Sequence, residues 1–191
     1  MAILTRRHLC RAFGVAIGAA LLSLGEGLVA QTTLSEYEVK AAYLYNFIKF
    51  VNWPADAFPE AGSPLVIGIA GTDPFGGNLE KMVQGKIINT RRLLVRQASR
   101  AEDLRGCHLV FVPRTDALRV GAVLEALNGL SVLTVGEEEN FAQRGGVVGF
   151  LREGERISFE INLEAAERSR LTISSKLAKV ATRLIHSGRK R

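Results

Sequence analysis

The stretch "PLVIGIAG", residues 64–71, predicts a β-strand that is buried on both faces. It is a continuous apolar run between a proline and a glycine, whereas a half-exposed strand would alternate apolar and polar residues. Further apolar runs follow, with helical or turn segments between them: RLLVRQA (92–98), HLVFVP (108–113) and SVLTVG (131–136). This alternation predicts a single compact α/β domain with a mostly parallel central sheet flanked by helices.

The segments between and after these runs complete the predicted domain. TDPFGG (72–77) has the composition of a turn. VVGFLREGERISFEIN (147–162) predicts a C-terminal β-hairpin at the edge of the sheet, with the turn at EGE. Helices are predicted over 78–85, 117–128, 163–169 and 174–187.

A helix is also predicted before the first strand. Ser35 and Glu38 have the spacing of a capping box, and Pro54 stops the helical pattern. This region is crowded with rings, since residues 37–58 hold seven of the chain's 13 aromatics. One apolar stripe suits the core, and it comprises Leu44, Phe47, Ile48 and Val51.

One sheet face cannot cover the whole circumference of so apolar a helix. Aromatic side chains are enriched in the cores of protein interfaces. We therefore expect Tyr43, Tyr45 and Phe50 to contribute to a dimer or partner interface, beside a role in the core.

The first thirty residues have the pattern of an export signal. Three arginines (Arg6, Arg7, Arg11) precede an apolar run of about 14 residues, and small residues lead to a predicted cut after Ala30. A retained membrane helix is the alternative, but a span needs roughly 20 apolar residues. The stretch TRRHLCR (5–11) also resembles a twin-arginine motif, which implies export in the folded state. The predicted location is the periplasm.

The remaining residues, 31–191, have the length of one domain. Removing residues 1–30 takes away three arginines and Glu26, so the net charge falls from +6 to +4. Three of the remaining positive charges lie in a short basic tail, residues 188–191, which we interpret as solvated. The body of the domain is then close to neutral, and nucleic acid is not a predicted partner.

Cys107 is the one cysteine that follows the predicted signal. An exported domain with one cysteine cannot form an internal disulfide, so its core must hold it together. Cys107 is expected either to be a buried small side chain or to form a disulfide with a second chain.

The carboxyl ends of the predicted strands suggest a pocket for a small polar ligand. In parallel sheets, ligands bind beyond these ends, at the point where the strand order reverses. The alternative is structural, with Asp73 closing a turn and Glu137 lying in the first turn of a helix. The pocket candidates are Asp73, Phe75, Arg114, Thr115 and Glu137.

Motifs for catalysis and for cofactors are missing. The glycines at the first strand match neither a dinucleotide fingerprint nor a P-loop, and no nucleophile-elbow motif occurs. Cys107 with His108 and His186 has no recognised zinc spacing. A nucleophile, a base and an orienting group cannot be assembled, so we expect neither an enzyme nor a cofactor.

Five segments together resemble the YfiR family of periplasmic proteins. They are EYEVKAAYLYNFIKFVNWP (36–54), PLVIGIAGTDPFG (64–76), CHLVFVP (107–113), SVLTVGEEENFAQRGGVVGFL (131–151) and ISFEINLEAAERSRLTISSKLAKVA (157–181). They occur in the family's order, and the resemblance extends from about residue 36 to 184.

The resemblance implies a compact α/β domain, usually a homodimer, that regulates rather than catalyses. YfiR represses an inner-membrane diguanylate cyclase by binding its periplasmic segment, which lowers cyclic di-GMP and biofilm formation. An outer-membrane lipoprotein relieves this repression. YfiR also carries two disulfides per chain, which the single Cys107 excludes here.

A second class of function remains open. Other members of the family accompany sensor kinases or outer-membrane receptors. The chain is therefore expected either to repress a membrane-bound signalling protein or to bind a small solute and feed a sensor kinase or transporter.

Overall fold

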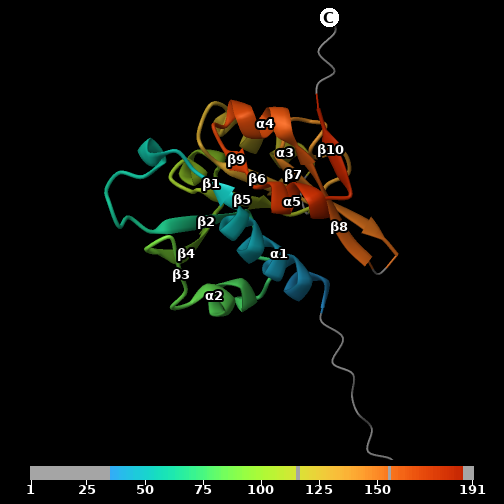
Figure 1. Cartoon of the computed structure of the whole chain (residues 1–191). Coiled ribbons are helices and arrows are strands. Elements are labelled where there is room, and N and C mark those ends of the chain that lie inside the picture. The colour runs from blue at the N-terminus through green and yellow to red at the C-terminus, as the bar shows by residue number, and fades with distance from the viewer. Residues whose placement is uncertain (1–34, 115–116, 155, 187–191) are drawn as a thin grey trace, which may run out of the picture. The chain divides into compact units, whose positions relative to one another are not determined.

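The structure, a computed structural model, describes residues 35–114, 117–154 and 156–186 (Figure 1). The predicted export signal (1–30), Thr115 and the basic tail (188–191) lie outside the described residues. What the sequence suggests for them stays a prediction.

A central sheet forms the middle layer of the domain. Most neighbouring strands pair in parallel, and the antiparallel pairs are β7 with β8 and β3 with β4. Among the described residues the sheet has eight strands in the order β10-β8-β7-β6-β5-β2-β4-β3. This confirms the predicted fold class. The strands are β2 (Leu65–Ala70), β3 (Ile87–Ile88), β4 (Arg91–Ala98), β5 (Leu109–Val112), β6 (Leu133–Gly136), β7 (Val148–Glu153), β8 (Arg156–Asn162) and β10 (Arg183–Ile185).

Helices cover both faces of the sheet. One face packs against α1 (Glu36–Phe50), α2 (Asn78–Val83), α4 (Leu163–Arg168) and α5 (Ser175–Val180). The other face packs against α3 (Ala117–Ala126) and the short 3-10 helix η2 (Ala101–Leu104). A small ribbon of β1 (Val51–Asn52) and β9 (Thr172–Ile173) and a 3-10 turn, η1 (Ala55–Ala57), complete the described elements.

Alternation along β2 explains why its sequence is apolar throughout. Leu65, Ile67 and Ile69 face the α1 side of the sheet, whereas Val66 and Ala70 face the α3 side. A parallel strand with helices on both faces has no polar side, so a continuous apolar run is required.

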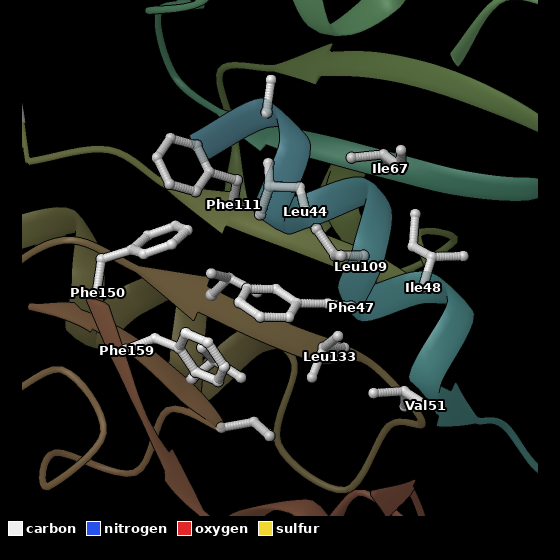
Figure 2. Packing of buried hydrophobic residues seen from close by; sticks show 14 of the residues in the cluster. Leu44, Phe47, Ile48, Val51, Ile67, Leu109, Phe111, Leu133, Phe150 and Phe159 are labelled. Atoms are coloured by element: carbon white, nitrogen blue, oxygen red, sulfur yellow. The ribbon is translucent and has the colours of Figure 1, made fainter. Parts of the chain in front are cut away.

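Helix α1 supplies the largest part of the core on its face. Figure 2 shows the α1 side chains pointing at the rings and aliphatic groups of the strands. Leu44, Phe47, Ile48 and Val51 are each 0–1% exposed, which confirms the predicted core stripe. Burial of each of these side chains contributes about 1.5–3 kcal/mol relative to exposure.

The ends of α1 have different physical causes. The capping box forms as predicted, because the Ser35 hydroxyl accepts from the Glu38 N–H and the Ser35 N–H donates to the Glu38 carboxylate at 2.7 Å. At the other end the helix stops at Phe50, before Pro54, since Val51 and Asn52 are extended and pair with β9.

The prediction of one helix over 174–187 is wrong in its second half. The helix α5 ends at Val180, and Arg183–Ile185 form β10, which pairs in parallel with β8. An ion pair contributes to this pairing, because Arg183 Nε donates to the buried Glu160 carboxylate at 2.8 Å. The predicted hairpin of β7 and β8 does form, and β10 places it one strand in from the edge of the sheet.

Cys107 lies in the core on the α3 side and is 3% exposed. Burial raises the pKa of its thiol. Its sulfur lies directly over Gly68, where an added Cβ would come within 2.7 Å of Sγ. A disulfide to a second chain would therefore require the thiol to leave this core, and the structure favours the interpretation as a buried small side chain.

Candidate functional site

The strand order β4-β2-β5-β6-β7 is that of a flavodoxin-like doubly wound sheet. The order reverses at β2, so the usual ligand crevice would lie between the carboxyl ends of β2 and β5. Here the ring of Phe75 lies beside that position, 5.0 Å from the Phe111 ring and 5.6 Å from the Tyr37 ring. Because Phe75 is only 2% exposed, it serves as core rather than as an open ligand contact.

Asp73 closes the turn after β2. Its carboxylate accepts the backbone N–H groups of Phe75 at 2.8 Å and Gly77 at 3.0 Å. These contacts correspond to the structural alternative for this residue, an aspartate that stabilises a turn.

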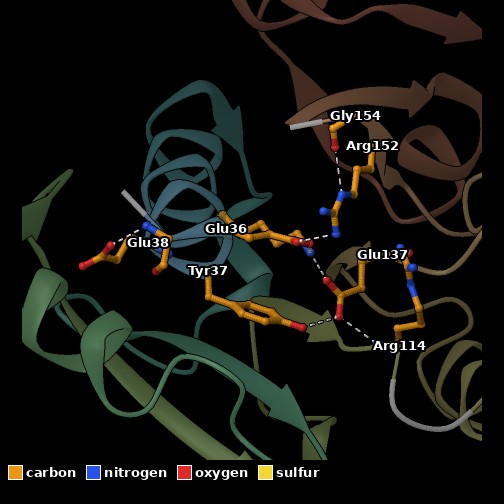
Figure 3. Close-up of polar contacts among 9 residues, drawn as sticks. Glu36, Tyr37, Glu38, Arg114, Glu137, Arg152 and Gly154 are labelled. Atoms are coloured by element: carbon orange, nitrogen blue, oxygen red, sulfur yellow. Dashed lines mark hydrogen bonds and ion pairs between the residues drawn. The ribbon is translucent and has the colours of Figure 1, made fainter. Parts of the chain in front are cut away.

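The structure does bring Arg114 and Glu137 together, at the carboxyl ends of β5 and β6. The backbone N–H of Arg114 donates to Glu137 Oε1 at 2.8 Å, and Arg114 Nη2 donates to the Glu137 carbonyl at 3.1 Å. Figure 3 shows the two residues beside the first turn of α1. Of the five pocket candidates, these two are in direct contact, while Thr115 lies outside the described residues.

The Glu137 carboxylate is 3% exposed and is held by groups from α1. Lys40 Nζ forms an ion pair with Oε2. The Tyr37 hydroxyl donates to Oε1 at 3.1 Å (Figure 3). A buried charge is costly unless it is paired and hydrogen-bonded, and Glu137 satisfies both conditions. Glu137 is followed by a turn and not by a helix. The structural alternative for this residue, a place in the first turn of a helix, is therefore wrong.

The charges continue from Glu137 toward the β7–β8 hairpin. Lys40 also pairs with Glu36, whose other oxygen accepts from Arg152 Nη1 at 2.8 Å. The hydrogen bond from Lys40 holds the pKa of Glu36 below its ordinary value. Burial, with the neighbouring Glu137 charge, raises the pKa of Tyr37 to about 12. We call this set, Glu36, Tyr37, Lys40, Arg114, Glu137 and Arg152, the charge network.

An open groove of about 1120 Å³ lies beside the charge network. Its walls are the tip of the β7–β8 hairpin, the loop after β6 and the start of β10. Glu160, which lines it, is 1% exposed and accepts from Gln143 Nε2 at 3.2 Å as well as from Arg183. Charges of both signs line the groove: Arg114, Arg152, Arg183, Glu138, Glu139 and Glu153.

The three aromatic interface candidates are half-buried and pack against the main core. Tyr43 is the most engaged, because its ring contacts Phe47, Phe150 and Phe159 and its hydroxyl donates to the Ile157 carbonyl at 3.2 Å. The Tyr45 ring has Lys49 Nζ 5.5 Å from its centroid. A role in an interface stays a prediction for all three.

Neither a metal centre nor a membrane span is found in the part of the chain that the structure describes. No group of three or more His, Cys, Asp or Glu side chains in that part could hold a metal ion. No helix in it has the length and apolar character needed to cross a membrane.

The strand order and the groove describe a doubly wound α/β domain with charges of both signs at the carboxyl end of its sheet. The chain belongs to the YfiR/HmsC-like family, whose model matches residues 37–182. Proteins of this family are regulatory, and the match supports, at the level of the family, a periplasmic regulator of cyclic di-GMP signalling.

Solved structures support the fold alone. A conserved domain protein from Vibrio cholerae O1 biovar El Tor is similar with a TM-score of 0.52 and 13% identity, over 80% of this chain and 61% of that one. This chain thus spans about three fifths of the length of that protein. An ABC domain in complex with L-Trp from Streptococcus pneumonia has a TM-score of 0.46 and 11% identity, over 63% of this chain and 56% of that one. No curated protein matches the sequence.

Sequence reasoning missed Lys40 and Arg152. A lysine on a helix usually points to solvent, yet Lys40 is 3% exposed and is paired with Glu137. The signal available was local, since Glu36 and Lys40 are spaced as an i,i+4 ion pair. The second partner, Glu137, is 97 residues away and could not be found from spacing.

Proposed function

We propose that this protein binds the periplasmic segment of an inner-membrane diguanylate cyclase and represses it, so that less cyclic di-GMP is made. The observation that carries the proposal is the charged groove at the carboxyl end of the sheet. Membership of the YfiR/HmsC-like family supports the signalling pathway. An outer-membrane lipoprotein that competes for the domain would relieve the repression.

The form of the groove suits a protein segment better than a small molecule. Small-ligand sites are mostly apolar, enclose most of the ligand and occupy roughly 300–1,000 Å³. The groove is open, its volume is about 1120 Å³, and arginine and glutamate side chains line it. Mixed charge of this kind selects a complementary partner surface and orients it.

The charge network gives the groove a rigid base. Lys40 and Glu137 join α1 to the end of β6, and Arg152 joins α1 to the hairpin. A partner segment that meets the hairpin therefore meets a surface that is fixed to the core. Repression requires only that the domain prefers the inactive form of the cyclase, and a hundredfold preference corresponds to about 2.7 kcal/mol.

Deleting the gene tests the proposed pathway. Cyclic di-GMP, measured in cell extracts, should rise in the deletion strain and fall again when the exported protein is restored. An unchanged level in the deletion strain would refute the assignment to a cyclase.

A charge reversal tests the groove. Arg152→Glu reverses a groove charge and should abolish the restoration of low cyclic di-GMP, whereas Lys81→Glu on α2, outside the groove, should restore it fully. The Arg152–Glu36 pair is exposed, so its loss should cost less than about 1 kcal/mol and leave the domain folded. Equal activity of the two folded variants would place the partner on another surface. For that case we propose Tyr45 and Phe50 as partner or dimer contacts, with Tyr45→Glu as the corresponding variant.

A further inference from the structure

A second cavity lies at the opposite end of the sheet from the groove, at the amino ends of β2 and β4. Its volume is about 260 Å³. The walls come from the last turn of α1, from β1, from the segment around η1 and from the β3–β4 turn. We call it the Trp53 cavity, since the only tryptophan of the chain lines it.

The lining of the Trp53 cavity combines apolar side chains with two asparagines, Asn52 and Asn89, and a single charge. The rings of Trp53 and Phe58 lie among aliphatic side chains, including Ile48, Leu65 and Ile88. Arg91 is the one charged residue among those that line it. Small-molecule sites combine apolar and aromatic walls with a small number of polar groups, and at about 260 Å³ this cavity lies just below their usual volume of roughly 300–1,000 Å³.

Arg91 is held in place while some of its donors stay free. Its guanidinium carbon lies 3.6 Å from the Phe58 ring centroid, and Nη1 donates to the carbonyls of Ser63 at 2.7 Å and Glu60 at 3.3 Å. The Phe58 ring in turn stacks on buried His108, with centroids 4.4 Å apart. Within the described residues, no acceptor contacts Nε or Nη2 of Arg91, so a positioned pair of donors remains for a ligand.

The turn at the rim of the cavity is strained. Asn89 and Thr90 both have positive φ, at 49° and 68°, and they form the two-residue turn between β3 and β4. A β-branched residue such as threonine rarely adopts this conformation, and backbone strain of this kind clusters at ligand sites. The turn positions Asn89, which lines the cavity, next to Arg91.

We propose that the Trp53 cavity binds a small carboxylate with an apolar body. The carboxylate lies against the free donors of Arg91, and the body lies among Trp53, Phe58 and Ile88. Arg91 is the one cation of the lining, so it can pair with one carboxylate, and the hydrogen bonds of such a pair are charge-assisted. This inference does not rest on the proposed function, because it concerns the other end of the sheet.

The fluorescence of Trp53 supplies a direct measurement. Phenylacetate is a suitable probe, and phenylacetamide is its neutral counterpart of the same shape. We expect a saturable change in fluorescence with phenylacetate, and binding at least about tenfold weaker for the amide, since hydrogen bonds to charged groups are the stronger ones. Equal affinity for the two probes, or no saturable change up to about 10 mM, would overturn the proposal.

Two neighbouring arginines provide matched variants. Arg91→Met should weaken phenylacetate binding at least about tenfold and leave the amide unaffected. Arg92→Met changes an exposed residue that does not line the cavity, and it should bind phenylacetate as the unmodified protein does. Circular dichroism checks folding, and Arg91→Lys retains the charge if Arg91→Met does not fold. An equal loss of binding in the Arg92 variant would contradict the assignment to Arg91.

Discussion

Tyr37 shows how burial and charge act on one side chain. Its hydroxyl donates to Glu137, and burial with that negative charge raises its pKa from an ordinary 10.0 to about 12. The folded state therefore holds this proton more tightly than the unfolded chain does. The resulting stabilisation is present below pH 10 and is lost as the pH rises toward 12.

Replacing Tyr37 by phenylalanine tests this effect. Between about pH 9 and 11, urea unfolding should show a smaller loss of stability in Tyr37→Phe than in the unmodified protein, since phenylalanine cannot ionise. Other groups that titrate in this range are present in both proteins, so their contributions cancel when the two losses of stability are compared. Identical losses would mean that the folded state does not raise the pKa of Tyr37.

Gly68 and Cys107 test how tightly the α3 side is packed. In Gly68→Ala the new methyl would lie 2.7 Å from the Cys107 sulfur and 2.9 Å from Leu104 Cδ2, so overpacking should cost about 1–3 kcal/mol. Cys107→Ala removes the sulfur and should cost about 1 kcal/mol by itself. The double variant should be more stable than the sum of the two losses predicts, by at least about 0.5 kcal/mol in urea unfolding. If the loss of the double variant equals the sum of the two single losses, the backbone around residue 68 moves to make room for the new methyl, and the Cys107 sulfur does not limit the packing.

At the scale of the element, the Lys40–Glu137 pair fixes α1 to the end of β6. Lys40→Met leaves a buried carboxylate without its cation and should cost about 3–5 kcal/mol. Adding Glu137→Gln removes the uncompensated charge, so the double variant should be more stable than Lys40→Met alone. Lys49→Met, at an exposed position of the same helix, should change stability by no more than about 0.5 kcal/mol. Urea unfolding measures the stability of the two single lysine variants and of the double variant. A double variant that is less stable than Lys40→Met would contradict the assignment of the loss to an unpaired buried carboxylate.

The elements that the sequence predicted well are those with a local signal. The capping box located the start of α1, and continuous apolar runs located the buried strands. The charge network was harder, because Glu36 and Lys40 come from α1 while Glu137 and Arg152 follow about a hundred residues later. The contact between Arg114 and Glu137 agrees with the rule that strand ends in a parallel sheet share one edge, while their role in a ligand pocket stays a prediction. Which polar side chain on α1 would meet them depends on how the helix rotates on the sheet.

At the scale of the whole molecule, β10 was missed because its sequence also suits a helix. Residues 174–187 contain lysine, alanine and leucine, which favour helix, and no proline or glycine separates α5 from β10. The deciding contacts are tertiary: the Thr182 N–H donates to the Phe159 carbonyl, and Arg183 meets the buried Glu160. Tertiary contacts of this kind override weak local propensity.

The position of β10 predicts a role in keeping the protein monodisperse. β10 pairs with one side of β8, and the other side of β8 pairs with β7. A chain ending at Ala181 would lose β10 and leave β8 as an unpaired edge. It would also lose Arg183, the cation that pairs with the Glu160 carboxylate. Unpaired edges template association with other chains, so size-exclusion chromatography should show higher-order aggregates of this variant. A chain ending at His186 retains β10 and should elute as the unmodified protein does. If both truncated chains elute unchanged, β10 does not protect the edge of the sheet.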